Sequence, residues 1–366
     1  MKLLFVTQYG ISAASSRTRV FQYLPYLKGK GHDCRIISVV KDKDISGSQV
    51  SVGTHPIRKM FYYIFVVWRT MVSGMLVVLH GRNSDVLFIQ KVVFPTFLRR
   101  AIRGLRTVVI FDFDDAIFTT EIQDINWLTR YKSHRNIAGV PAMLKISKLA
   151  IVENAYNASF AREYVSAVET ITGPIDTERY SPVKKDMPIH NNPCVVLGWI
   201  GSASTLPYLN EICPALERIG RDYNDVYLHV VGSEKFHLCE MSVISELWSF
   251  ETEVEKLQSF DIGLMPIPDN TWTRGKGGYK LLQYMAIGLP VVASPVGVNS
   301  QIVDHGQNGF LACDNIEWEK FLRILIADSQ LRKLMGGRGR RKVEENYSLK
   351  KSQPYLENLI IRTASQ

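Results

Sequence analysis

The feature that most restricts the fold of this chain is an alternation of strands and helices that runs through it twice. In residues 1–180, short apolar runs with the length of buried strands alternate with helical stretches and with turns rich in glycine and serine. The alternation stops at residues 173–193, which are rich in turn formers and polar residues, and it starts again at Val195. This pattern is typical of parallel sheets that carry helices on both faces. We therefore expect an α/β protein with two doubly wound domains of similar size.

The apolar runs predict the individual elements. Strands are expected at residues 2–7, 34–40, 86–90, 107–111, 149–152, 170–171, 195–200, 226–231, 247–250, 262–265 and 291–293. The main helices are expected at residues 17–28, 206–219, 279–287, 318–328, 329–346 and 349–362. Ligands of such sheets bind beyond the carboxyl ends of the strands, so two domains that face each other are expected to form the binding cleft.

The net charge of +9 is concentrated in the first half of the chain. Residues 1–180 hold 24 Lys and Arg against 14 Asp and Glu, whereas residues 181–366 hold 20 against 21. Such a surplus suits nucleic acid, an anionic membrane face or an acidic acceptor, or it merely keeps the surface soluble. No nucleic-acid-binding motif accompanies the charge, so we expect no nucleic-acid partner.

The cysteines indicate a reducing compartment. The five cysteines are scattered along the chain and have the spacing of neither a disulfide framework nor a metal site. The apolar run at residues 1–6 is too short for a signal peptide and is better explained as the first buried strand. The expected location is therefore the cytoplasm.

Residues 57–80 favour contact with a membrane. Met60 to Trp68 is an unbroken apolar and aromatic run, and basic residues interrupt and flank the whole stretch. It approaches the length of a spanning helix, but Arg69 near its middle would cost a few kcal/mol in a bilayer core. We therefore expect an interfacial helix that lies on the inner face of the cytoplasmic membrane. Buried core helices and a true span remain the alternatives.

The most informative local segment is residues 275–309. A glycine-rich turn opens a helix near Tyr279, and the helix stops at Gly288, before Pro290 and a buried strand. Free backbone N–H groups at a helix start form an anion site, and lysines there oppose the helix dipole unless an anion is bound. The residues of this predicted anion site are Lys276, Gly277, Gly278, Tyr279 and Lys280. The alternative is that the two lysines are simply solvated.

Three motifs of this segment carry a family resemblance. Met285–Gly288, Pro290–Ala293 and Asn308–Phe310 keep the order and spacing of the donor-binding signature of retaining glycosyltransferases of family four, the glycosyl transferases group 1. The resemblance implies a GT-B fold, in which two Rossmann-like domains face a cleft and a C-terminal helix returns to the first domain. The implied division is residues 1–182 for the acceptor, residues 183–348 for the donor and residues 349–366 for the returning helix.

The resemblance also implies an activity. Such an enzyme is a configuration-retaining glycosyltransferase of the hexosyltransferase type, acting in polysaccharide biosynthesis. It moves a sugar from a nucleoside-diphosphate-sugar to a glycan or lipid-linked acceptor. It requires no metal cofactor, so cations and N–H donors must stabilise the charge on the leaving phosphate. Lys280 is expected to supply that charge.

The chain departs from the family at its donor site. Gly275 and Gln283 occupy the positions of two family glutamates, and Gln283 keeps the ability to hydrogen-bond a ribose hydroxyl. Gly201 and Ser202, in the loop after the first strand of the second domain, are expected to bind the donor, although this loop lacks the Arg and Lys of many relatives. Lys276 and Lys280 are the expected replacements, and a loss of activity is the alternative.

Two charged groups in the first half are further candidates. Asp112 and Asp114 follow a predicted strand, and either carboxylate is suited to orient an acceptor hydroxyl or to take its proton. The alternatives are turn formers, or a divalent cation held by the Asp-x-Asp pattern, which the two-domain layout disfavours. Arg17 and Arg19, after the first strand, are expected to bind the donor phosphates or an acidic acceptor, or else to be ordinary surface residues.

Other function classes are weaker. A nucleotide-sugar epimerase, a sugar-phosphate synthase, or a non-catalytic membrane-associated protein that binds sugar nucleotides would use a similar fold. A dinucleotide oxidoreductase is disfavoured because the first turn, after Gly10, lacks the Gly-x-Gly-x-x-Gly spacing.

Overall fold

The computed structural model describes residues 1–45, 56–119, 127–182 and 194–365. The predicted linker at residues 183–193 lies outside the described residues. The chain divides into two compact units. Unit 1 contains residues 1–174, 275–277 and 349–366, and unit 2 contains residues 175–274 and 278–348.

Unit 1 is built on a six-stranded parallel sheet with the order β2-β1-β3-β4-β5-β6. The strands are β1 (Lys2–Tyr9), β2 (Asp33–Val40), β3 (Val86–Gln90), β4 (Val108–Phe113), β5 (Leu149–Val152) and β6 (Val168–Thr170). The helices are α1 (Ala14–Arg19), α2 (Leu24–Gly29), α3 (Asp42–Ile45), α4 (Pro56–Gly81), α5 (Thr96–Arg103), α6 (Trp127–Leu144), α7 (Ala155–Arg162) and α14 (Leu349–Ser365), with the 3-10 turn η1 (Phe21–Tyr23).

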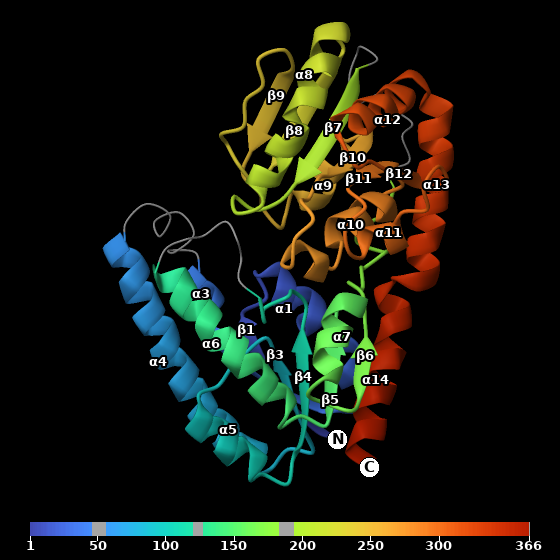
Figure 1. The fold of residues 1–366 in the computed structure, drawn as a ribbon. Coiled ribbons are helices and arrows are strands. Elements are labelled where there is room, and N and C mark those ends of the chain that lie inside the picture. Colours follow the sequence, from blue (N-terminus) through green and yellow to red (C-terminus); the bar gives the residue numbers. More distant parts are fainter. Residues whose placement is uncertain (46–55, 120–126, 183–193, 366) are drawn as a thin grey trace. The chain divides into compact units, whose positions relative to one another are not determined.

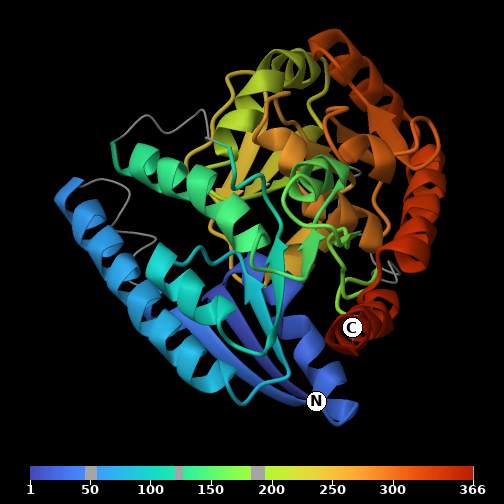
Figure 2. The same ribbon diagram turned by 60° about the horizontal axis from the view of Figure 1, so that its bottom comes forward.

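Alternating side chains place helices on both faces of this sheet, as expected for buried strands. Along β1, Leu4 and Val6 pack into a core with residues of α4 to α7. Leu3 and Phe5 face the opposite way, into a core shared with α2 and α14. Figure 1 shows α4 and α6 on one side of the strands of unit 1 and α14 on the other, and the turned view in Figure 2 agrees. The C-terminal helix therefore completes unit 1.

Unit 2 repeats this architecture. Its six parallel strands have the order β12-β11-β10-β7-β8-β9. They are β7 (Val195–Ile200), β8 (Val226–Val231), β9 (Ser242–Glu246), β10 (Ile262–Met265), β11 (Val291–Ala293) and β12 (Gly309–Leu311). The helices are α8 (Cys213–Asp222), α9 (Glu253–Gln258), α10 (Tyr279–Ala286), α11 (Asn299–Ile302), α12 (Asn315–Ala327) and α13 (Ser329–Asn346), with η2 (Leu206–Ile212) and η3 (Thr273–Gly275). The predicted fold class of two Rossmann-like domains is confirmed.

Three predicted elements were wrong in detail. The strand expected at residues 247–250 is a loop. The strand of this region is β9, which ends just before the loop and is a half-exposed edge strand with few apolar residues. The helix expected at residues 17–28 is broken into α1, η1 and α2, and the helix expected at residues 206–219 is broken into η2 and α8. Proline stands in the first turn of α2 and of α8. It lacks a backbone N–H, so it starts a new helix instead of continuing the preceding one.

Candidate donor and catalytic site

The loops at the carboxyl ends of the strands of unit 1 gather charged side chains. Lys91 follows β3, Asp112 lies at the end of β4, and Glu153 follows β5. Since all strands are parallel, these ends share one edge of the sheet. Arg19 approaches the same edge from α1. This edge is where ligands of doubly wound sheets bind.

Arg19 and Asp112 form a buried ion pair. The Arg19 Nε atom donates to both oxygens of Asp112, at 3.1 Å each, and Nη1 donates to Glu153 Oε2 at 2.8 Å. The exposed fractions are 3% for Arg19, 1% for Asp112 and 4% for Glu153. Breaking a buried pair is costly because it leaves an unpaired charge. In this structure Arg19 and Asp112 bind each other within unit 1. Their predicted roles in ligand binding and proton transfer stay predictions.

Arg17 also has a structural position. Its side chain is buried, and Nη1 donates to the backbone oxygens of Ile11 and Ser12, at 3.3 and 3.2 Å. These carbonyls belong to the turn that follows β1. The prediction that Arg17 binds phosphate is not supported, because its guanidinium is directed at this turn.

Lys91 neutralises the next two carboxylates. Its Nζ atom lies 2.8 Å from Asp114 Oδ1 and 2.6 Å from Asp115 Oδ2. Burial opposes the charge on Lys91, but the two carboxylates outweigh it and raise its pKa. Asp114 is half-buried and is the predicted catalytic carboxylate that keeps some access to solvent. Within the described ranges, no group of three or more His, Cys, Asp or Glu side chains is arranged to hold a metal ion.

Glu153 is a member of this site that the sequence analysis missed. Its Oε1 atom accepts the backbone N–H of Gly173 at 2.6 Å. Burial raises its pKa to about 7, although Arg19 acts in the opposite direction. The sequence signal that could have identified Glu153 as a site residue is its position directly after a buried strand.

The residues of the predicted anion site do not all belong to the same unit. Lys276 and Gly277 belong to unit 1, whereas Gly278, Tyr279 and Lys280 belong to unit 2. Lys276 Nζ lies 3.8 Å from Asp115 Oδ1, so Lys276 is part of the charged edge of unit 1.

In unit 2, Lys280 lies beside the loop that follows β7. Its Nζ atom is 3.4 Å from Thr205 Oγ1 and 4.3 Å from the centre of the Trp199 ring, a cation–π distance. A Cβ atom on Gly201 would lie 2.6 Å from Lys280 Nζ. Ser202 is exposed in the same loop. The structure therefore brings together the predicted donor-binding residues Gly201, Ser202 and Lys280.

The start of α10 has the geometry of an anion-binding turn. Gly278 caps the helix with a φ of 66°, a left-handed conformation that glycine adopts without strain. Lys280 in the first turn places a positive charge beside the N-terminal end of the helix dipole, where an anion would be stabilised by both. Gly278 is buried, whereas Tyr279 and Lys280 are half-exposed, so the start of the helix is accessible at these two residues.

Gln283 is directed into a buried network. Its amide nitrogen donates to Glu253 Oε1 at 2.9 Å and to the Tyr180 hydroxyl at 3.2 Å. Glu253 also accepts from the Tyr180 hydroxyl at 2.6 Å and from Trp248 Nε1 at 3.0 Å. Gln283 is 3% exposed. The predicted contact of its amide group with a ribose hydroxyl is therefore not supported.

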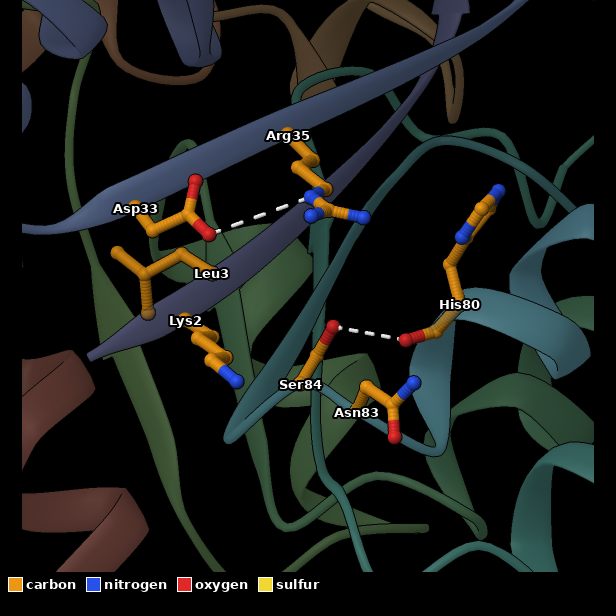
Figure 3. Close-up of a pocket in the computed structure, with 7 residues that line it drawn as sticks. All are labelled: Lys2, Leu3, Asp33, Arg35, His80, Asn83 and Ser84. Carbon is orange, nitrogen blue, oxygen red and sulfur yellow. Dashed lines mark hydrogen bonds and ion pairs between the residues drawn. The ribbon is translucent and has the colours of Figure 1, made fainter.

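Two cavities lie away from the start of α10. The larger, about 520 Å³, is beside the carboxyl ends of β10 to β12 in unit 2. Three of the residues that line it are acidic, Glu211, Asp269 and Asp314, and none is basic, a composition that disfavours a pyrophosphate. The smaller, about 150 Å³, lies at the opposite edge of the unit 1 sheet. Figure 3 shows it between the starts of β1 and β2 and the end of α4, and its volume is too small for a nucleotide sugar.

Comparisons with known proteins match a segment of the second half of the chain to one family. Residues 194–328 match the family described as glycosyl transferases group 1. Spore coat protein SA of Bacillus subtilis (strain 168) is 20% identical over 279 residues, which are 67% of this chain and 72% of that protein. The predicted resemblance to glycosyl transferases group 1 is confirmed for this segment.

Solved structures share the fold. Sucrose-phosphate synthase from Thermosynechococcus elongatus superposes with a TM-score of 0.70 at 12% identity, over 99% of both chains. Anabaena HepE in complex with UDP and glucose superposes with a TM-score of 0.70 at 13% identity, over 99% of this chain and 100% of HepE. At sequence identities this low, the superpositions show a similarity of fold alone.

Proposed function

We infer, from the match of residues 194–328 to glycosyl transferases group 1, that the chain is a retaining glycosyltransferase of the hexosyltransferase type. It moves a sugar from a nucleoside-diphosphate-sugar donor to a glycan or lipid-linked acceptor. One observation carries this proposal. In unit 2, Lys280 at the start of α10 lies beside the 201–205 loop, which follows the carboxyl end of β7.

The proposed donor site is the start of α10. HepE, which shares the fold, has been solved with UDP and glucose. In the proposed arrangement the pyrophosphate lies against the backbone of Gly278 and Tyr279, and the hydroxyl of Ser202 contacts it. Lys280 stabilises the negative charge that develops on the phosphate oxygen as the sugar departs. These groups supply the stabilisation without a metal cofactor.

The proposed acceptor site is the carboxyl edge of unit 1. Asp114, half-buried and paired with Lys91, is the candidate that orients the acceptor hydroxyl. The basic surplus of residues 1–180 suits an acceptor that is acidic or is carried by an anionic lipid.

The surface of α4 supports a membrane-bound acceptor. Its inner face, with Ser73, Gly74 and Val77, is buried in unit 1. A Cβ on Gly74 would lie 2.3 Å from Leu98 Cδ1, so α4 and α5 pack closely. The outward residues are large and apolar, and each is more than half exposed: Phe61, Ile64, Trp68, Met75 and Leu79.

This surface fits the interface of an anionic leaflet better than a span. By length and composition, residues Met60–Gly81 would suffice to cross a membrane. However, Arg69 lies within this stretch and donates to the Val39 carbonyl at 2.9 Å, which ties the helix to β2. On α5, Phe97 and Arg100 are also exposed. We propose peripheral binding to the cytoplasmic face of the membrane through α4, with apolar side chains in the interface and basic residues on anionic headgroups.

The enzymatic proposal is tested by transfer assays with nucleoside-diphosphate-sugars and lipid-linked, glycan and sugar-phosphate acceptors. Lys280→Ala should lower kcat at least about a hundredfold, because it removes a charge that acts in the transition state. Lys320→Ala is the matched control, since Lys320 is an exposed lysine of unit 2 that also lies near an aromatic ring, 5.6 Å from the centre of Phe321. Equal rates for wild type and Lys280→Ala would reject this site. NMR of the product's anomeric proton tests retention.

The membrane proposal is tested by cosedimentation with vesicles of phosphatidylglycerol and phosphatidylcholine. Trp68→Glu should weaken binding about tenfold or more, because it places a charge in the apolar interface. Ile316→Glu is the control, since Ile316 is an exposed apolar residue on α12. Equal loss in both variants, or none in Trp68→Glu, would reject α4 as the contact.

A further inference from the structure

The small cavity of unit 1 is lined mainly by basic and polar side chains. Its lining residues, all of which belong to unit 1, are Lys2, Leu3, Asp33, Arg35, His80, Asn83 and Ser84. The first four lie on the neighbouring strands β1 and β2, and the last three come from the end of α4 and the turn that follows it (Figure 3). The cavity therefore lies at the amino-terminal edge of the sheet, opposite the edge proposed for the acceptor.

The charge of the lining is positive. Lys2 and Arg35 each carry a positive charge, and Asp33 is the one carboxylate that lines the cavity. Arg35 Nε lies 4.0 Å from Asp33 Oδ2, and both side chains are more than half exposed. An exposed pair at this distance contributes little, so the Arg35 guanidinium can bind another anion. Within the described part of the chain, neither Lys2 Nζ nor the His80 ring has a hydrogen-bond or ion-pair partner.

The lining also offers the hydrogen-bond donors that a phosphate needs. A guanidinium such as that of Arg35 binds two phosphate oxygens at once, and ammonium, imidazole and amide groups add further N–H donors. The carbonyl of His80, at the end of α4, would repel an anion as a bare acceptor. It already accepts from the Ser84 hydroxyl at 3.0 Å and from the Asn83 N–H at 3.1 Å.

The size of the cavity favours a compact group. Its volume is about 150 Å³, whereas pockets that enclose a whole small molecule measure roughly 300–1,000 Å³. A terminal phosphate is compact, has three strong acceptor oxygens and carries up to about two negative charges. The phosphate of a diester has a substituent on each side and fits such a cavity less well. The expected ligand is therefore a phosphomonoester.

The exposed apolar surface of α4 reaches this cavity. Met75, Leu76 and Leu79 are 57%, 39% and 61% exposed, and His80 directly follows Leu79. A helix that lies on a membrane buries such side chains just below the level of the headgroups. A lipid that contacts these residues would therefore have its headgroup beside the cavity.

We propose that this cavity binds the terminal phosphate of a phosphomonoester, with Arg35 as the bidentate donor and with Lys2, His80 and Asn83 around the phosphate. The adjoining surface of α4 favours the headgroup of an anionic lipid as the source, and for this source the inference rests on the proposed membrane contact. A soluble phosphomonoester supplies the same chemistry and needs no membrane.

The lipid source is tested by cosedimentation of the full chain with phosphatidylcholine vesicles that contain either phosphatidic acid, a phosphomonoester, or phosphatidylglycerol, a diester, at equal zeta potential. Wild type should bind the phosphatidic acid vesicles about fivefold more tightly or better, and Arg35→Gln should lose this preference, because an amide cannot form the charged fork. Arg103→Gln is the matched control, since Arg103 is exposed at the end of α5 and is not among the lining residues. It should keep the preference while weakening binding to both kinds of vesicle.

The soluble source is tested by calorimetric titration with glycerol 3-phosphate. Arg35→Gln should weaken binding about tenfold, because it removes a charged hydrogen-bond donor. Arg221→Gln, in unit 2, is the matched control and should leave binding unchanged. The Arg221 side chain is 64% exposed, as is that of Arg35, and Arg221 Nη2 lies 3.9 Å from Glu240 Oε1. Binding at the proposed donor site would be the same in both variants, so the difference between them reports on this cavity.

Each outcome decides the proposal. A preference for phosphatidic acid that Arg35→Gln alone removes supports the site and assigns the phosphate to a lipid. A loss seen only in the titration supports the site and assigns the phosphate to a soluble ligand. Equal behaviour of Arg35→Gln and its control in both experiments would overturn the site. If wild type binds neither kind of vesicle, the proposed membrane contact fails, and the titration alone decides whether the cavity binds phosphate.

Discussion

The substitution Gln283→Glu tests the buried network of unit 2 quantitatively. It replaces an amide nitrogen that lies 2.9 Å from Glu253 Oε1 with a carboxylate oxygen. Two unit charges at that distance repel by about 6 kcal/mol at an effective dielectric constant of about 20. Binding a proton is cheaper, because a protonated carboxyl can again donate to Glu253. The variant is therefore expected to fold with one shared proton.

The size of the effect follows from the cost of that proton. A glutamate with an ordinary pKa of about 4.3 must be protonated at pH 7, which costs about 3–4 kcal/mol at about 1.4 kcal/mol per pH unit. In the folded Gln283→Glu variant, residues 253 and 283 share a proton that two separate glutamates of the unfolded chain would release. The folded variant therefore binds more protons than the unfolded variant above about pH 4.3. The free energy of unfolding should therefore fall as pH rises, and the loss should shrink to about 1 kcal/mol at pH 5.

Urea denaturation of wild type and Gln283→Glu at pH 5 and pH 7, followed by tryptophan fluorescence, measures this difference. The exchange variant, Gln283→Glu with Glu253→Gln, should recover most of the stability, because it again places one amide opposite one carboxylate. Gln301→Glu, at an exposed residue of α11, is the control and should change little. An equal loss at both pH values, or no loss at pH 7, would refute the reasoning.

Three further outcomes are expected. Gly198→Ala should destabilise unit 2 by about 2–4 kcal/mol in urea denaturation, because its Cβ would lie 1.9 Å from the Phe260 ring; wild-type stability would contradict this. Asp112→Asn should cost about 3–5 kcal/mol, since it leaves the buried Arg19 with one anionic partner, and a loss below about 1 kcal/mol would show that the pair is not essential. Glu153 has a folded pKa of about 7 against 4.5 when unfolded, so the free energy of unfolding should fall as pH rises from 4.5 to 7, by at most about 1.4 kcal/mol per unit; Glu153→Gln should flatten that slope, and identical pH profiles would exclude the raised pKa.

The fold was largely predictable because its signal is local. Strands that are buried on both faces are apolar at every position, as in Val195–Ile200, and parallel pairing follows from the intervening helices. The edge strand β9 was misplaced because half-exposed residues carry no such signal, and the apolar side chains of residues 247–250 imitated it.

The site was less predictable because its contacts are distant in sequence. Arg19 and Asp112 are 93 residues apart in the sequence. From the sequence they are two separate candidate site residues, whereas in the structure they form one ion pair with each other. Gln283 and Glu253 likewise form a hydrogen bond with each other although they are 30 residues apart in the sequence. Lys91 and Glu153 were within reach of prediction, because each directly follows a buried strand.

The central claim is that the start of α10 in unit 2 holds the pyrophosphate of a nucleotide sugar. Calorimetric titration of the wild-type chain with UDP, GDP, ADP, CDP and TDP tests it most directly. We predict saturable binding of at least one of them, with a Kd below about 1 mM, weakened about tenfold or more by Lys280→Ala and unchanged by Lys320→Ala. Failure of every nucleoside diphosphate to bind, or equal affinity in Lys280→Ala, would contradict the account.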